Sequence, residues 1–258
     1  MMPKPSTPET AISLFVLAPA VLIAACVLSA CSHVPAPPSP VRLPVDIKDD
    51  TTIGSARLTW HDAPETTRAG SFTPGLEIEY DRGIGRSNQH LGTNEFIQID
   101  NKTLSGPQEV RHHGEVRYGH LAFNGIWRFP GRASKLELEW VAGLGQAQLG
   151  LRSESRTLAV EPLVAKYSLG GLVLGAGPRW NFTDTLAFEA RFQALASSPS
   201  SDDRFWYREI GVRYRPLKNV AIRMGYSDMD YRPANLSEGD SPVHVRMYGP
   251  FLGLDFPF

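Results

Sequence analysis

The sequence predicts an all-β protein, a closed antiparallel up-and-down transmembrane β-barrel of eight to ten strands. The first observation behind this prediction is a period of two in hydrophobicity, which dominates the chain after residue 50. The second is that one face of each alternating segment is large and apolar, whereas the other is charged or glycine. The third is that tight turns alternate with long polar connections, as in outer-membrane barrels.

The composition agrees with a strand-rich fold. The chain has 258 residues, a formal net charge of −1, 23 Gly and 21 Pro, a mix that favours strands and turns. A net charge near zero gives no case for a nucleic-acid partner. Both cysteines, Cys26 and Cys31, lie near the start, so the body has no disulfide, thiolate zinc site or cysteine nucleophile. No phosphate-loop or calcium-loop pattern is present, and we predict no cofactor and no metal site.

The first 30 residues are predicted to be an export signal. Residues 12–27 form an apolar run that is short for a membrane span and contains Pro19, which favours a secretory signal. The run ends in Leu-Ser-Ala-Cys, which resembles a bacterial lipobox. The resemblance implies cleavage before Cys31, acylation of its thiol and sorting to the outer membrane, because Ser32 rather than Asp follows. An ordinary signal peptide with a chance cysteine is the alternative.

Residues 31–50 are predicted to be a tether, and residues 51–258 the barrel. The tether is rich in proline and has no periodicity, which is typical of a semi-extended spacer. Seven strands are expected from residue 114 onward, an eighth near 93–100 is needed for closure, and a further hairpin favours ten. The expected strands are 52–61, 74–82, 93–100, 114–129, 134–150, 164–181, 185–196, 205–216, 219–229 and 243–258.

The connections are expected to differ at the two ends of the barrel. Three of them carry a glycine, then an arginine beside an aromatic residue, then a tight turn, and these are interpreted as periplasmic turns. They cover 125–133, 177–184 and 211–219. The long polar connections are interpreted as extracellular loops, namely 101–113, 151–162, 196–204 and 231–242.

The last 13 residues, 246–258, resemble the terminal strand of small OmpA-like outer-membrane β-barrel proteins of Gram-negative bacteria. They read Arg-Met-Tyr-Gly-Pro-Phe-Leu-Gly-Leu-Asp-Phe-Pro-Phe. The resemblance covers residues 114–258 well and 51–113 weakly. It implies an outer-membrane location and recognition of the terminal strand by the barrel-assembly machinery, through Leu252, Leu254, Phe256 and Phe258.

The inward face of the predicted barrel carries acids and arginines in nearly equal number. Because an isolated buried charge is very costly, we expect these groups to pair through the lumen. A narrow or gated polar path is the alternative, and a porin is not predicted because so small a lumen is filled by side chains. The predicted lumen network consists of Glu77, Glu79, Glu137, Glu139, Glu189, Glu209, Asp255, Arg128, Arg179, Arg191, Arg213, Arg215 and Arg223.

The predicted function is therefore non-enzymatic: envelope structure, or presentation of loops to a surface ligand or host factor. Outer-membrane lipid and the assembly machinery are the other expected partners. One alternative is a barrel hydrolase acting on lipid A or peptides; its candidate residues are His61, Asp62, Asp228 and Asp230, with His120 and Ser227 as a second pair. The other alternative is a soluble lipocalin-like periplasmic lipoprotein, in which Trp140, Phe188 and Phe192 would point into a cavity.

Overall fold

The computed structural model describes residues 39–61, 72–129, 135–197, 203–234 and 239–257. These residues form an all-β structure that consists of one large, mostly antiparallel sheet and one small sheet. No helix among them is long and apolar enough to cross a membrane. Cys31, the export signal and Phe258 lie outside the described residues.

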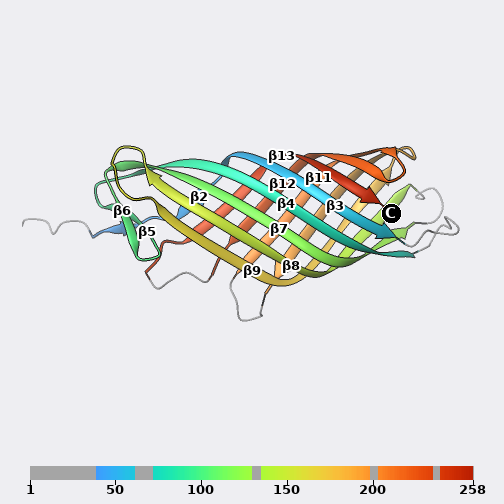
Figure 1. Cartoon of the computed structure of the whole chain (residues 1–258), viewed down its shortest axis with the longest axis horizontal. Coiled ribbons are helices and arrows are strands. Elements are labelled where there is room, and N and C mark those ends of the chain that lie inside the picture. Colours follow the sequence, from blue (N-terminus) through green and yellow to red (C-terminus); the bar gives the residue numbers. More distant parts are fainter. Residues whose placement is uncertain (1–38, 62–71, 130–134, 198–202, 235–238, 258) are drawn as a thin grey trace, which may run out of the picture. The chain divides into compact units, whose positions relative to one another are not determined.

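Nine strands of the described chain pair in a ring (Figure 1). Neighbours along the chain are antiparallel, and the last strand, β13, pairs with β12 on one side and with β3 on the other. In order, the strands of the ring are β3 (Asp49–His61), β4 (Phe72–Leu91), β7 (Gln108–Arg128), β8 (Leu136–Ser155), β9 (Leu163–Asn181), β10 (Leu186–Ala196), β11 (Arg204–Leu217), β12 (Val220–Arg232) and β13 (Val243–Pro257).

The expected even number of strands and the purely antiparallel pairing are wrong. With nine alternating strands, the first and last run in the same direction, and β3 and β13 pair in parallel. The segment expected near 93–100 does not join the ring, because β4 continues to Leu91 and leaves only β5 (Glu95–Ile99). This strand of five residues pairs instead with β6 (Lys102–Ser105) and β1 (Val41–Arg42).

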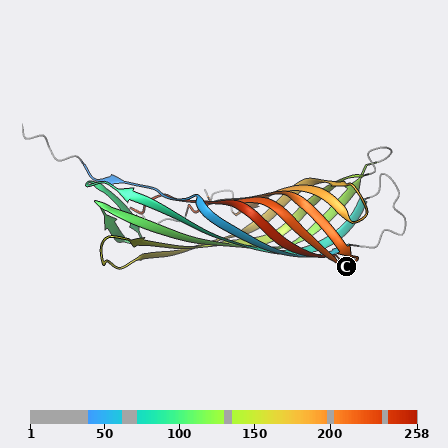
Figure 2. The same ribbon diagram turned by 90° about the horizontal axis from the view of Figure 1, so that it is seen from above.

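The two ends of the ring differ in their connections. At one end, called the turn end here, residues 62–71, 129–135, 182–185 and 218–219 join consecutive strands. At the other, the loop end, the connections are 92–107, 156–162, 197–203 and 233–242, and the first of them, between β4 and β7, contains β5 and β6. The strands β4, β7, β8 and β9 have 19 to 21 residues and extend toward the loop end beyond the shorter β10 to β13 (Figures 1 and 2). They take in parts of the predicted loops 101–113 and 151–162.

Near the turn end, large apolar side chains are exposed on every strand of the ring, and their neighbours in sequence are buried or partly buried. On β8, for example, Leu138 and Trp140 are exposed whereas Glu137 and Glu139 are buried. We call the exposed set the apolar belt. It comprises Leu58, Trp60, Phe72, Leu76, Ile78, Tyr80, Leu121, Phe123, Trp127, Leu138, Trp140, Leu144, Leu172, Leu174, Trp180, Leu186, Phe188, Phe192, Ile210, Val212, Tyr214, Met224, Tyr226, Tyr248, Leu252 and Leu254.

The lipocalin-like alternative is therefore wrong in its central expectation. Trp140, Phe188 and Phe192 are exposed by 36%, 39% and 43%, so they do not fill a cavity. The residues that alternate with them, among them Glu139 and Glu189, are the buried ones.

Toward the loop end the pattern is reversed: most exposed side chains are polar, and the buried ones are apolar. On β4 the exposed residues become mostly polar, with Arg82, Arg86 and Asn88 beside the exposed Ile84, and the strand ends in the fully buried Leu91. On β8, Gln148 is exposed while Leu149 is buried. The buried side chains here form an apolar core that includes Val45, Ile47, Leu91, Ile97, Ile99, Leu104, Val110, Val116, Tyr118, Leu149, Leu151, Leu163, Phe205, Tyr207, Met229 and Met247.

The folded body begins before the predicted end of the tether at residue 50. β2 (Val45–Ile47) pairs in parallel with β13, and both Val45 and Ile47 are wholly buried in the apolar core. The small sheet belongs to the same core, since Ile97 and Ile99 of β5 are buried in it. Burial of these side chains explains why a proline-rich segment takes up strand structure.

Candidate functional site

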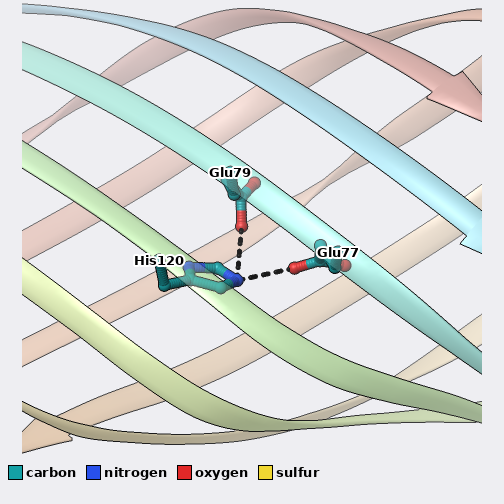
Figure 3. A group of neighbouring side chains, drawn as sticks. All are labelled: Glu77, Glu79 and His120. Atoms are coloured by element: carbon teal, nitrogen blue, oxygen red, sulfur yellow. Dashed lines mark hydrogen bonds and ion pairs between the residues drawn. The ribbon is translucent and has the colours of Figure 1, made fainter.

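The centre of the ring holds a cluster of buried ionisable side chains. Glu77 and Glu79 lie two residues apart on β4, so both point to the buried face, and His120 is the residue of β7 opposite Glu79. Figure 3 shows the three side chains converging: Nε2 of His120 lies 2.8 Å from Oε1 of Glu77 and 4.0 Å from Oε2 of Glu79.

Three arginines from other strands complete this central cluster. Arg57 of β3 donates from Nη2 to Glu79 Oε1 at 2.8 Å. Arg191 of β10 donates to both Glu77 and Glu79, the latter at 3.2 Å. Arg223 of β12 donates to Glu79 at 3.1 Å and to Glu209 at 2.7 Å. The cluster therefore joins β3, β4, β7, β10, β11 and β12 through charge-assisted hydrogen bonds.

A second layer of ion pairs lies nearer the turn end. Arg179 of β9 contacts Glu139 at 2.8 Å, Glu189 at 3.3 Å and Glu137 at 3.7 Å. Arg128 donates to Glu137 at 2.9 Å. Across the layer, Arg213 contacts Asp255 at 2.8 Å, and the hydroxyl of Thr59 donates to the same carboxylate.

The ligand atoms of Glu77, Glu79 and His120 all lie within 4.8 Å of one another, which is a spacing that a metal ion could use. Both carboxylates, however, already accept hydrogen bonds from Arg57, Arg191 or Arg223. A divalent cation would have to displace these guanidiniums and remain beside their positive charges, at a large electrostatic cost. The geometry thus favours a structural cluster of ion pairs over a metal site.

A pocket of about 920 Å³ lies at the turn end. Six lysine and arginine side chains and four acidic ones line it, and the cations include Lys135, Arg215 and Lys218. Lys135 and Arg215 donate to the backbone carbonyls of Phe182 and Asp184, and no carboxylate within the described residues pairs with either. The innermost wall is formed by the second layer of ion pairs.

Most residues of the predicted lumen network lie together in these two layers and at the pocket. Arg128, Arg213 and Arg215 are partly buried, and the other ten are buried. Arg215 stands apart, since it lines the pocket and bonds only to a backbone carbonyl. Of the predicted assembly signal, Leu252 and Leu254 are exposed on β13 and Phe256 is half-buried.

The candidate catalytic residues do not come together. His61 lines the pocket at the turn end, whereas Asp228 and Asp230 lie on the outer face of β12 toward the loop end. Asp228 is paired with Arg246 at 2.9 Å, and Asp230 with His244 at 3.0 Å. Asp62 lies outside the described residues.

The members of the second candidate pair are not hydrogen-bonded to each other, since Ser227 Oγ and His120 Nδ1 both lack a partner among the described residues. Ser227 and His120 are both buried, but His120 Nε2 is hydrogen-bonded to Glu77 within the central cluster.

Sequence reasoning missed Arg57, whose side chain is among the most buried in the molecule. Arg57 lies within 4.0 Å of Glu77, Glu79 and Glu209. The signal was available: in 52–61 the residues Ala56, Leu58 and Trp60 alternate with Arg57, so period two assigns the arginine to the inner face. His120 was missed as a network member for a different reason, since its strand alternates less regularly.

Comparisons with known proteins found no match: no protein-family model, no curated protein and no solved structure matches the chain.

Proposed function

We propose that this chain is a closed transmembrane β-barrel of the bacterial outer membrane, non-enzymatic, with a lumen sealed by paired charges. The observation that carries the proposal is the apolar belt: exposed apolar side chains surround the ring at the level where the buried side chains are ionised. Water would penalise that arrangement, because exposed hydrocarbon gains nothing and buried charge costs much. In a lipid environment the exposed apolar side chains are favourable, and the charged side chains stay inside the ring, away from lipid.

The height of the belt fits a bilayer. On β9 it extends from Leu172 to Trp180, which is nine residues, and on β8 from Leu138 to Leu144, which is seven. A transmembrane β-strand needs about 9–11 residues when it is tilted by about 45°. The ring pairing also supports the proposal, since every strand of the ring has two partners and hydrocarbon tolerates no open sheet edge.

Aromatic side chains lie at both edges of the belt, where interfaces of membrane proteins carry them. Those toward the turn end are Trp60, Phe72, Trp127, Trp180 and Tyr214. Those toward the loop end are Tyr80, Tyr226 and Tyr248. Beyond this second group most exposed residues are polar, as on β4 with Arg82 and on β8 with Gln146, and Ile84 of β4 is exposed as well.

The interior supports a structural or interaction role over transport or catalysis. Two layers of ion pairs fill the ring near the turn end, and the apolar core fills it toward the loop end. Of the candidate hydrolase carboxylates, Asp228 is paired with Arg246 and Asp230 with Arg232. We therefore propose that the barrel stabilises the envelope and presents its long loop end, including β5 and β6, to a surface ligand or host factor.

Export and assembly follow from the sequence. In this proposal, residues 1–30 are removed, Cys31 is acylated, and the barrel-assembly machinery recognises the terminal strand through Leu252, Leu254, Phe256 and Phe258. Acylation is tested by the mass of the mature protein, with Cys31→Ser as the control.

Tryptophan fluorescence in brominated lipid tests the transmembrane part. Four of the five tryptophans are exposed on the belt, and Trp206 is half-buried on the same face of β11. The full chain reconstituted in vesicles of brominated phosphatidylcholine should show strong quenching. Variants that retain only Trp60 or only Trp140 should each be quenched, because both side chains are exposed on the belt.

Unquenched fluorescence in a folded, lipid-associated sample would exclude the proposed orientation of the belt. A gel shift gives a second test, because a folded barrel resists SDS and changes its mobility on boiling. A chain that stays soluble and monomeric without detergent, with no such shift, would contradict the proposal.

A further inference from the structure

Two arginines lie side by side just beyond the belt on the loop side. Arg82 of β4 and Arg117 of β7 are directly opposite each other in the antiparallel register. Both side chains are about half exposed, at 51% each. Like charges in this position destabilise a sheet unless something compensates them.

A single carboxylate compensates both arginines. Oε1 of Glu115 accepts a hydrogen bond from Nε of Arg82 at 2.7 Å and from Nε of Arg117 at 2.8 Å. The terminal nitrogens of both guanidiniums donate no hydrogen bond to a described residue, so they are available to an external acceptor. Two positive charges and one negative charge leave a net charge of +1 at this site, which we call the arginine pair.

The level of the arginine pair is that of lipid headgroups if the chain is a barrel. Tyr80, an aromatic residue at the edge of the belt, is the preceding outward residue on β4. Next to the pair, Arg117 lies opposite Gln148 of β8, an exposed residue that can also donate a hydrogen bond. The donors of three neighbouring strands thus face the same small area at the interface.

We propose that Arg82 and Arg117 bind the phosphate monoester of a lipid headgroup in the leaflet at the loop end. This inference rests on the proposed transmembrane barrel. Phosphate suits the site because it accepts two guanidinium forks at once and carries the charge needed to offset the arginine pair. A zwitterionic headgroup brings its own cation and would not neutralise the pair.

Native mass spectrometry of the full chain in detergent tests the inference. The protein is titrated with phosphatidic acid, a phosphate monoester, and with phosphatidylcholine. A basic residue near an anionic surface contributes about fivefold in affinity, so Arg82→Gln/Arg117→Gln should bind phosphatidic acid about 25-fold more weakly. Arg152→Gln/Arg156→Gln removes the same charge farther from the belt and should bind like the unmodified protein.

Glu115→Gln should change the affinity for phosphatidic acid in the opposite direction. It removes the competing carboxylate and should raise the affinity for phosphatidic acid severalfold. Equal binding of the two lipids, or equal losses in the two double variants, would overturn the inference. So would inorganic phosphate that binds as tightly as the lipid and with the same dependence on Arg82 and Arg117. Failure of the tryptophans to be quenched by lipid would instead reject the barrel itself.

Discussion

At the scale of single residues, the interior depends on charges that compensate one another. Arg57 is the clearest case, since its guanidinium is fully buried and faces Glu77, Glu79 and Glu209. Such a pair need not stabilise the fold relative to apolar packing, but loss of one partner leaves a buried charge without compensation. Replacement of Arg57 by a neutral residue is therefore expected to be poorly tolerated in the interior.

Arg57→Met should lower the free energy of unfolding by about 3–5 kcal/mol, because it leaves Glu79 short of one cation. Urea titration of the detergent-solubilised protein, followed by the loss of SDS resistance, measures the change. Arg156→Met is the control, since Arg156 and Glu109 form an exposed pair worth about 0–1 kcal/mol. Similar losses in both variants would show that the buried cluster has no special role.

His112 is expected to make the stability of β7 near the loop end depend on pH. It is buried on β7, between Ser153 Oγ at 2.8 Å and Gln89 Oε1 at 2.9 Å. Burial, and to a lesser degree the charge of His113, lowers the pKa of His112 to about 4. Because the unfolded pKa is higher, at about 6.5, stability from the neutral ring is complete above pH 6.5 and is lost as the pH falls toward 4.

Hydrogen exchange of residues 108–116 should therefore accelerate between pH 6.5 and 4, after correction for the intrinsic rate. His112→Gln keeps a polar group in place and should remove most of this acceleration. His90→Gln, at an exposed position of β4, should leave it unchanged. An acceleration that persists in His112→Gln would assign the pH dependence to another group.

At the scale of strands, the alternation in the sequence predicted most of the fold. The faces of β8, for instance, are those expected, with Leu138 and Trp140 exposed and Glu137 and Glu139 buried. The exchange of chemistry toward the loop end was not predicted. Apolar residues keep period two there but on the opposite face, and the alternation does not show which face is exposed and which is buried.

The two halves of β9 should therefore respond differently to an added charge. Leu174 lies in the belt, whereas Ser168 is exposed on the same face of the strand beyond it. Leu174→Arg should cost about 2–4 kcal/mol if it faces the middle of a bilayer, and Ser168→Arg about 0–1 kcal/mol. Refolding into vesicles in urea measures both. Equal tolerance of the two arginines would indicate that the belt faces water.

At the scale of the whole molecule, the number of strands was the main error of the sequence prediction. An even count follows from assuming that the first and last strands are antiparallel, and no residue pattern reports which strands pair at the closure. Here the number of strands in the ring depends on residues 92–107. This segment has too few alternating apolar residues to form a tenth strand of the ring, and it forms β5 and β6 instead. The parallel pairing of β3 with β13 is the consequence.

Cross-linking tests that pairing directly. In the parallel register Ala56 lies opposite Leu254, and Leu252 lies opposite Gly54. With Cys26 and Cys31 replaced by serine, Ala56→Cys/Leu254→Cys should form a disulfide on mild oxidation, because opposed residues have Cα atoms at bonding distance. Leu58→Cys/Leu252→Cys should not, since these positions are four residues out of register, about 13 Å along the strand. An antiparallel pairing centred on Ala56 and Leu254 would link both pairs, so efficient cross-linking of the second pair would overturn the nine-strand ring.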